Sequence, residues 1–544
     1  MRISFSLTIL ATVFALSMAM PAEAKPTGGE GRPADKVFLN GVIHTVDPQR
    51  PRAEALAIVD GHFMRVGDNA DVKPLIGPET EIVDLEGRLI IPGLNDAHVH
   101  AVDGAIAKLF ECNFSFTATP DEIAKRISEC VAAQPDAEWI MGGRWGSSFF
   151  VDHKIESPRR WLDQYSGGAA VVLIDDTRHN AWLNTRALKL LNITDQTEDP
   201  EGGEIQREGG TRTPNGLLIE GAALQLRQTL PEWTPEQFVE AAREVARIAA
   251  SFGITGWKEA TAAEKHLKAY HALDTMGELE GHAAACIVAS YGQRDEPLDY
   301  GRLDNLRRTY GSARFNTDCV KMYMDGVPNT ARTAAMLHPY LPDPQFPEGF
   351  NGGETHIPLE TLVADLTKLD QMGITAKIHA TGDRAVRIVL DAIEKVREIN
   401  GPSGLRHEIA HAGFVADADI PRFAELNAVA DLSPYIWYPS PIMQSIKAAL
   451  GERGEHYFPI RSLLEADAPV AAGSDWPSVV PSMNPWVGIE GMVTRQDPLS
   501  NDGPALWPAE AISLEQAIEI YTLSGARALR LVDKTGSITA GKSA

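Results

Sequence analysis

Eight strand-like apolar runs that alternate with helical patterns constrain the fold of this chain more than any other feature. Strand and helix patterns in alternation are typical of βα units, which build a parallel sheet. Eight units predict an α/β fold with a closed (β/α)₈ TIM barrel, whose active site lies at the carboxyl ends of its strands. The predicted strands cover residues 93–100, 254–260, 282–290, 318–326, 374–380, 405–413, 427–434 and 469–477. The helical patterns cover residues 234–252, 262–277, 358–372, 383–398, 416–426, 441–450 and 511–528.

Two further regions flank or interrupt this repeat. Residues 25–92 contain short β-like pieces separated by glycine-containing turns, which predict a small antiparallel sheet. Residues 101–253 are too long for one βα unit, and they predict a large insertion over the barrel mouth, a place suited to substrate selection. We assign residues 93–530 to the barrel, and we expect residues 531–544 to return towards the small domain.

The first 24 residues have the pattern of a secretory signal peptide. Arg2 precedes an apolar run from Ile3 to Met20, and Ala22-Glu23-Ala24 fits a small-x-small cleavage site. A membrane anchor is the alternative, but the polar stretch that follows favours removal of the segment. We therefore expect an exported protein, periplasmic or secreted, that begins near Lys25 and has no other membrane-spanning stretch.

The formal net charge is −24, within a composition that is otherwise ordinary for a globular protein. So acidic a surface repels nucleic acid and anionic membranes, and we exclude both as partners. We expect a small-molecule substrate, and a homo-oligomer is compatible with the sequence.

The four cysteines have no close paired spacing, so they do not indicate a disulfide scaffold, although export permits disulfides. Cys286 and Cys319 lie in apolar strand-like runs, where we expect buried free thiols. Cys112 and Cys130 are able to pair, and the sequence leaves their state open.

Polar residues at the predicted strand ends indicate a metal centre. Positions i and i+2 of a strand face the same side, so the two histidines after Pro92-Gly93 point together. Each polar residue alone has an ordinary structural explanation, such as a hydrogen-bonded histidine, a snorkelling lysine or an Asx turn. Together they lie where barrel chemistry occurs, and this joint pattern predicts metal ligands. The six predicted ligands are His98, His100, Lys321, His379, His411 and Asp475.

The chemistry of these side chains fits hydrolysis. Four imidazoles and a carboxylate favour a divalent ion such as Zn²⁺. Burial and nearby cations lower the pKa of a lysine, and a neutral Lys321 amine can add CO₂ to form a carbamate that bridges two metal ions. Two ions that share a water hold a hydroxide ready to attack a carbonyl. Asp475 would accept the proton and pass it to a leaving nitrogen, so we assign catalytic roles to Asp475 and Lys321.

These residues resemble those of the amidohydrolase superfamily, in its binuclear subtype with a carboxylated lysine. Within it the chain is similar to the YtcJ-like branch, which includes N-substituted formamide deformylases. The resemblance implies a metal-dependent hydrolase of amide or other C–N bonds, in a barrel flanked by a β-sandwich, with the six ligands named above. The matching stretches are GLNDAHVH, RHNAWLNTRAL, VKMYMDG, IHATGDRAV and GSDWPSVVPSMNPWVGIEGMVTR.

Two departures from the branch have consequences. A glutamate usually precedes the strand-six histidine, where this chain has Ala410, and this predicts altered support of His411. Members also continue past a segment like GSITAGKSA, so we expect either that this chain is shortened or that the small domain is incomplete or built differently.

Four other residues are candidates for substrate contacts: His407, His179, Trp145 and Trp476. Structural hydrogen bonding explains His407 equally well, and ordinary packing explains the tryptophans.

Three function classes remain open from the sequence. The first is hydrolysis of a small amide, and the second is a related reaction on the same scaffold, by a lactonase, a carboxylesterase or a single-metal deaminase. Lys321 argues against the deaminase, because one metal needs no bridging lysine. The third is an exported metal-binding or regulatory protein without turnover, against which the intact residue set, with Asp475, argues.

Overall fold

The computed structural model describes residues 32–115, 118–146, 149–175, 180–200, 203–227, 229–289, 294, 296–329, 331–342, 351–478, 480–498, 500 and 503–544. The predicted signal peptide lies outside the described residues. The chain forms two compact units, one from residues up to Ile90 together with Ile538–Ala544, and one from Ile91–Ser537.

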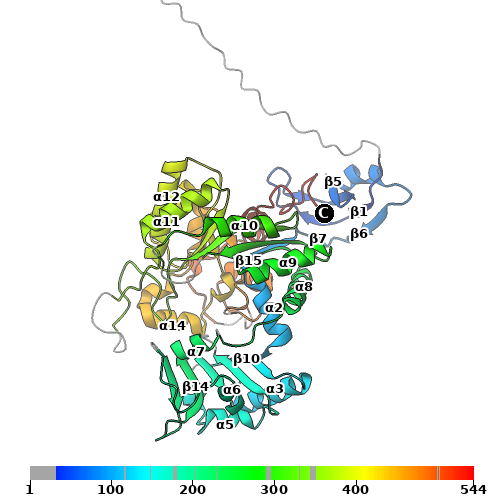
Figure 1. Cartoon of the computed structure of the whole chain (residues 1–544). Helices are drawn as coiled ribbons and strands as arrows, with labels where there is room; N and C mark the ends of the chain where they lie inside the picture. The colour runs from blue at the N-terminus through cyan, green and yellow to red at the C-terminus, as the bar shows by residue number, and fades with distance from the viewer. Residues whose placement is uncertain are drawn as a thin grey trace, which may run out of the picture. The chain divides into compact units, whose positions relative to one another are not determined.

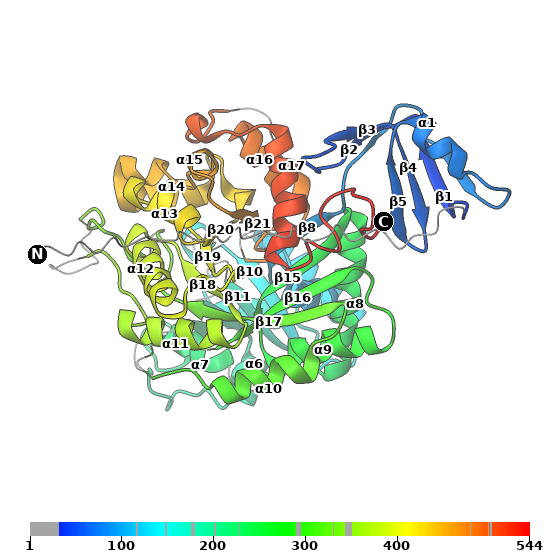
Figure 2. The same cartoon turned by 90° about the horizontal axis from the view of Figure 1, so that it is seen from above.

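The larger unit contains the predicted parallel barrel sheet (Figures 1 and 2). Its eight strands follow one another in chain order, and every neighbouring pair is parallel. At the seam between the first and last strands, the Asp475 N–H donates to His98 O at 2.7 Å and the His100 N–H donates to Trp476 O at 2.8 Å. The predicted barrel fold is confirmed. The strands are β8 (Leu94–Val99), β15 (Ile254–Ala262), β16 (His282–Val288), β17 (Phe315–Tyr323), β18 (Thr375–Ala380), β19 (Glu408–His411), β20 (Val429–Leu432) and β21 (Val470–Ala472).

Helices follow the strands and cover the outer face of the sheet (Figure 2). α8 begins after Thr234, whose hydroxyl accepts the Gln237 N–H, with Pro235 at the first helical position. The sequence pattern misses α10, because only Leu303 and Leu306 of this helix are buried. The helices are α2 (Ala101–Phe110), α8 (Pro235–Ser251), α9 (Glu264–Thr275), α10 (Tyr300–Tyr310), α11 (Leu359–Gln371), α12 (Asp383–Asn400), α13 (Ile420–Glu425), α14 (Pro441–Leu450), α15 (Ile460–Glu465), α16 (Pro485–Thr494), α17 (Leu514–Glu519) and α18 (Gly525–Ala528).

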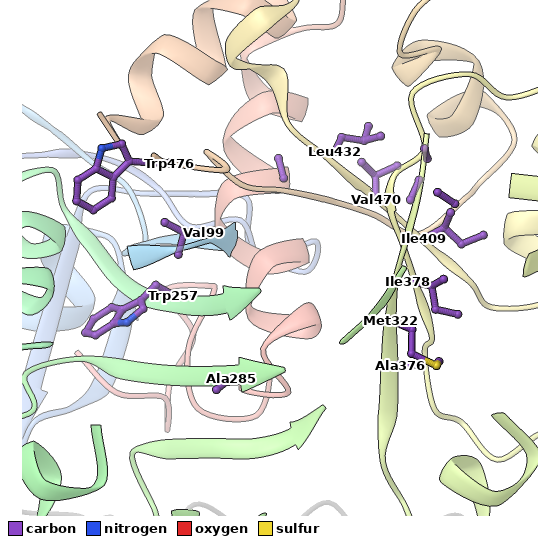
Figure 3. Packing of buried hydrophobic residues seen from close by; sticks show 14 of the residues in the cluster. Val99, Trp257, Ala285, Met322, Ala376, Ile378, Ile409, Leu432, Val470 and Trp476 are labelled. Atoms are coloured by element: carbon purple, nitrogen blue, oxygen red, sulfur yellow. The ribbon is translucent and has the colours of Figure 1, made fainter. Parts of the chain in front are cut away.

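The alternation of side chains along each strand separates the core from the barrel interior. On β18, Ala376 and Ile378 pack into the main hydrophobic cluster. Figure 3 shows these two side chains with others of the cluster. The alternate residues Lys377 and His379 face the other way. The Lys377 ammonium donates to Ala97 O of β8 at 3.1 Å, on the opposite wall of the barrel. Polar groups of the strands therefore lie inside the barrel.

The insertion is a six-stranded mixed sheet with its own helices and its own hydrophobic clusters (Figure 1). It extends from β9 to α7, so α2 and α8, which fall in the predicted insertion of 101–253, are barrel helices that pack in the main core. Its strands are β9 (Cys112–Asn113), β10 (Trp139–Trp145), β11 (Ala170–Asp175), β12 (Asn180–Leu183), β13 (Gly203–Arg207) and β14 (Pro214–Glu220). Its helices are α3 (Pro120–Ala133), α4 (Phe149–Asp152), α5 (Pro158–Asp163), α6 (Thr185–Leu190) and α7 (Gly221–Arg227).

The described residues of the smaller unit form two short sheets, one α-helix and one 3₁₀ helix. Both sheets are mixed, because β1–β6 and β2–β7 pair in parallel, which corrects the predicted purely antiparallel sheet. The segment Ile538–Ala544 returns to this unit, where the Ile538 N–H donates to Thr45 O and the Phe63 N–H to Lys542 O. The elements are β1 (Lys36–Leu39), β2 (Val42–His44), β3 (Arg52–Ala53), β4 (Ala55–Val59), β5 (His62–Gly67), α1 (Asn69–Val72), β6 (Glu81–Asp84) and β7 (Leu89–Ile90).

The cysteines form two disulfides, Cys112–Cys130 and Cys286–Cys319. The expectation of free thiols at Cys286 and Cys319 is therefore wrong. The two residues are direct partners in the β16–β17 register, and this brings their Cα atoms within 4.2 Å. A linear sequence does not reveal such a register.

Among the residues that the structure describes, none of the helices combines the length and the apolar content that crossing a bilayer requires.

Candidate metal centre

Three of the predicted ligands meet at the seam of the barrel. His98 lies near the end of β8, His100 follows that strand, and Asp475 follows β21. The Asp475 Oδ1 lies 3.2 Å from His100 Nε2 and 3.6 Å from His98 Nε2. One ligand atom from each residue lies within 4.8 Å of the other two, which is a spacing that one metal ion can bridge.

His379 and His411 extend this cluster across the neighbouring strands. The ring centroid of His411 lies 4.8 Å from that of His98 and 4.8 Å from that of His379. His379 Nε2 lies 3.0 Å from Gly326 O, and His411 Nδ1 lies 3.4 Å from Ser433 Oγ. These contacts leave His379 Nδ1 and His411 Nε2 as the ring nitrogens that can bind a metal.

Lys321 projects from β17 with 1% of its surface exposed. Its ammonium lies 5.1 Å from the centre of the Tyr323 ring, which in turn contacts His379. Burial, reinforced by the positive charge of Lys377, lowers the pKa of Lys321 to about 7. A substantial share of the amine is therefore neutral near neutral pH.

The electrostatics of the cluster favour the protonation states that bind metal. Burial lowers the pKa of His379 to about 4 and that of His411 to about 3, and the charge of Lys321 acts in the same direction. Burial and the charges of Lys377 and Lys321 lower the pKa of His98 well below its ordinary value. Burial opposes ionisation of Asp475, but the adjacent imidazoles of His100, His411 and His98 hold its pKa below its ordinary value. Neutral imidazoles and an ionised carboxylate are the forms that ligate metal.

Two buried atoms test whether the site fits a metal ion. His98 Nε2 and Asp475 Oδ1 have no hydrogen-bond partner in the described part of the chain. Buried polar atoms are almost always paired, and these two ligand atoms lie 3.6 Å apart, so both are placed to bind one metal ion. A nitrogen and oxygen donor set of this kind suits Zn²⁺ or a similar divalent ion.

Buried carboxylates hold the segments that carry the ligands. Asp96 Oδ1 accepts the N–H groups of His98 and Ser474, each at 3.1 Å, and so joins β8 to the segment after β21. Asp325 accepts the N–H groups of Thr381 and Gly382, each at 2.9 Å, and fixes the turn after His379. Burial raises the pKa of both Asp96 and Asp325 to about 7.

Sequence reasoning missed a fully buried residue that contacts a predicted ligand. Asp431 on β20 lies with its Oδ2 2.7 Å from His98 Nδ1, and it pairs with Lys377 of β18. Both residues are completely buried. The sequence does contain a sign of these two residues, because each is a charged residue inside an apolar strand-like run: Asp431 in VADL and Lys377 in TAKIH.

Of the four candidates for substrate contacts, three are described by the structure and one lies outside the described residues. His407 precedes β19, where its Nε2 lies 3.3 Å from Asp370 and its Nδ1 accepts the Ala376 N–H, so the structure does not bring it to the cluster. Trp145 is buried in the core of the insertion, and its indole N–H donates to Leu173 O. Trp476 follows Asp475 and packs against Gly104 of α2. His179 lies outside the described residues.

The structure shows the surroundings of His411 where this chain has Ala410 in place of the glutamate that is usual in the branch. Ala410 is fully buried and offers no polar group to His411, whose described side-chain partner is Ser433 of the neighbouring strand region.

A parallel barrel with histidines and an aspartate at the carboxyl ends of its strands fits the class of metal-dependent hydrolases. The model of the amidohydrolase family matches residues 81–544, and the chain belongs to this family. As a member of this family, the protein is an amidohydrolase.

The relatives agree with this assignment over nearly the whole chain. The chain is 30% identical to Protein LONG AFTER FAR-RED 3 of Arabidopsis thaliana over 94% of its own length and 86% of the relative. It is 27% identical to an N-substituted formamide deformylase of Arthrobacter pascens (94% and 92% covered) and 27% identical to the putative amidohydrolase YtcJ of Bacillus subtilis (93% and 92%). The predicted similarity to the YtcJ-like branch is confirmed.

The fold is similar to that of an uncharacterized metal-dependent hydrolase from Pyrococcus horikoshii. The TM-score is 0.73 at 23% sequence identity, with 94% of this chain and 96% of the other covered.

Proposed function

We propose that the protein hydrolyses an amide bond of a small molecule with two divalent metal ions, of which Zn²⁺ suits the donor set best. The observation that carries the proposal is the pair of buried ligand atoms, His98 Nε2 and Asp475 Oδ1, that face each other without partners. The residues that would hold the ions are His98, His100, Lys321, His379, His411 and Asp475.

The chain's own residues have distinct tasks in this reaction. When bound, the ions supply an activated water and polarise the substrate carbonyl. Asp475 takes a proton from the attacking water and delivers it to the leaving nitrogen as the C–N bond breaks. The ionised state of Asp475, which His100 supports, suits its role as proton acceptor.

Lys321 would act after carboxylation. Its neutral amine attacks CO₂, the N–C bond forms, and the nitrogen releases a proton, which leaves a carbamate anion. The fully buried position and the pKa of about 7 support this role, because they supply the neutral amine. The deformylase name of the Arthrobacter relative supports an amide-type substrate.

Metal counting and a substrate panel test the proposal. We expect about two ions per chain and turnover of N-substituted formamides or other small amides by the zinc-loaded protein. One ion per chain would favour a deaminase. Turnover of esters or lactones alone would favour an esterase or a lactonase. Metal binding without any turnover would favour a binding or regulatory protein.

We also propose that the protein is exported. The signal-like pattern of residues 1–24 and the two disulfides support export, since disulfides persist in oxidising compartments. Mass spectrometry of the protein isolated from the native cell should give an N-terminus near Lys25. A protein that retains residues 1–24 would contradict the proposal.

A further inference from the structure

Four charged side chains form a continuous chain inside the barrel, beneath the predicted ligands. They are Lys258 of β15, Glu408 of β19, Lys377 of β18 and Asp431 of β20, and none is more than 2% exposed. Lys377 Nζ lies 2.8 Å from Glu408 Oε2 and also pairs with Asp431. Lys258 pairs with the other oxygen of Glu408.

This arrangement is costly as a way to fill a barrel. Removing charges from water is unfavourable even after relaxation, and apolar replacements of similar volume are often as stable or more stable. The chain compensates by using backbone acceptors, since Lys377 also donates to Ala97 O and Lys258 to Ala528 O. Stability alone therefore does not account for these charges.

The chain of charges ends at a predicted metal ligand. Asp431 Oδ2 lies 2.7 Å from His98 Nδ1, so this nitrogen carries the hydrogen and the lone pair is left on Nε2. The same Nε2 faces Asp475 Oδ1 at 3.6 Å and has no hydrogen-bond partner in the described part of the chain. The contact with Asp431 thus fixes both the tautomer and the ring plane of His98.

We propose that Asp431 is a positioning residue for His98, and that Lys377 holds the Asp431 carboxylate in place for this purpose. The inference rests on the proposed metal site. Lys377 lies between two carboxylates on neighbouring strands, so its ammonium fixes the position of Asp431 against the barrel wall. The imidazole then points at the metal position before any ion arrives, and binding does not have to order it.

The test measures zinc affinity by competition with a chromophoric chelator in the full chain carrying Asp431→Asn. We expect affinity to fall about ten- to a hundredfold, which is the usual effect of losing such a partner. The visible absorption of the cobalt-loaded variant should also shift, because a reoriented imidazole changes the ligand field. A merely structural role would leave that spectrum unchanged.

The matched control is Asp370→Asn. Asp370 lies 3.3 Å from His407 Nε2 in a second buried His–carboxylate pair, away from the predicted ligands. We expect this variant to keep wild-type zinc affinity and the wild-type cobalt spectrum, whatever its stability.

Should Asp431→Asn fail to fold, Lys377→Met/Asp431→Leu removes both charges of the pair and the acceptor for His98 Nδ1. The same or a larger loss of zinc affinity is expected in this double variant. Wild-type affinity in either folded variant, or an equal loss in Asp370→Asn, would overturn the inference. A wild-type chain that binds no divalent metal would instead overturn the proposed function.

Discussion

At the scale of single residues, Asp475 has two features that suit a proton carrier. It adopts a left-handed backbone conformation with φ of 56°, which aspartate tolerates better than most residues. Its carboxylate is held by His100, at the seam where the barrel closes.

Asp475→Asn should lower kcat by roughly a hundred- to ten-thousandfold, the usual contribution of general acid–base catalysis, while metal stays largely bound. Steady-state kinetics with metal analysis checks this. The control is Asp467→Asn, the same substitution at another left-handed aspartate (φ 57°) that precedes β21. Near-normal kcat in Asp475→Asn would refute the proton-transfer role.

Lys321→Ala should lose most of the bound metal, because the carbamate proposed above cannot form. Short carboxylic acids should restore part of the activity by taking the place of the carbamate. The same acids added to Asp475→Asn serve as the control and should restore nothing. A Lys321→Ala variant that retains about two ions per chain would refute the bridging role.

The pKa of Lys321 predicts how reconstitution depends on pH. With a pKa of about 7, the neutral fraction of the amine rises about tenfold between pH 6 and pH 8. The imidazoles of His379 and His411, with pKa values of about 4 and 3, are already neutral at pH 6 and add no change. Metal-free protein supplied with zinc should therefore activate faster at pH 8 than at pH 6 when the dissolved CO₂ concentration is held the same at both pH values. Equal activation rates would contradict carboxylation through the free amine.

Some residues of the site can be predicted from the sequence and others cannot, depending on whether their role requires knowledge of contacts across the barrel. His98, His379 and Asp475 are predictable, because strand ends in a barrel converge and polar residues there stand out in apolar runs. Asp431 and Lys377 are not, because their roles depend on which strands face each other across the barrel. The Cys286–Cys319 disulfide depends in the same way on a strand register that local patterns do not encode.

At the scale of elements, the insertion contacts the segment that carries Asp475. The Arg144 guanidinium on β10 donates to Pro477 O at 2.6 Å. This contact joins the end of an inserted strand to the turn after the predicted proton carrier.

Arg144→Ala should lower kcat/KM about tenfold or more, since a hydrogen bond from a charged group contributes about 1.5–3 kcal/mol. Arg186→Ala is the control in the same insertion, because Arg186 forms an exposed pair with Glu138 at 3.5 Å. Kinetics that are equal in the two variants would show that the Arg144 contact does not serve the site.

The strands and helices of the barrel are predictable where their buried residues recur at a regular spacing in the sequence. Each of the eight predicted strand segments overlaps a barrel strand, and α8, α9, α11, α12 and α14 match their patterns within two residues at each end. α10 has too few buried residues to show a helical spacing in the sequence. α2 is not predicted as a barrel helix because it falls within the predicted insertion of 101–253. The mixed pairing of the small sheets depends on contacts between distant segments.

At the scale of the whole molecule, we expect bound metal to add to stability, because an ion that binds only the folded state shifts the unfolding equilibrium towards that state. Removal of metal by a chelator should lower the thermal midpoint, and a free ion at a thousand times its dissociation constant accounts for about 4 kcal/mol. Differential scanning fluorimetry with and without chelator checks this, with zinc added back as the control. A midpoint that does not respond to zinc would contradict binding at a site formed by folding.

The seam between β8 and β21 determines when the metal site can form during synthesis and folding of the chain. His98 leaves the ribosome near the beginning of the barrel and Asp475 near its end, so the two cannot meet until nearly all of the chain has been synthesised. A chain that ends before Asp475 consequently lacks one of the six predicted ligands, and the complete site can form only as one of the last steps in the folding of a newly made molecule.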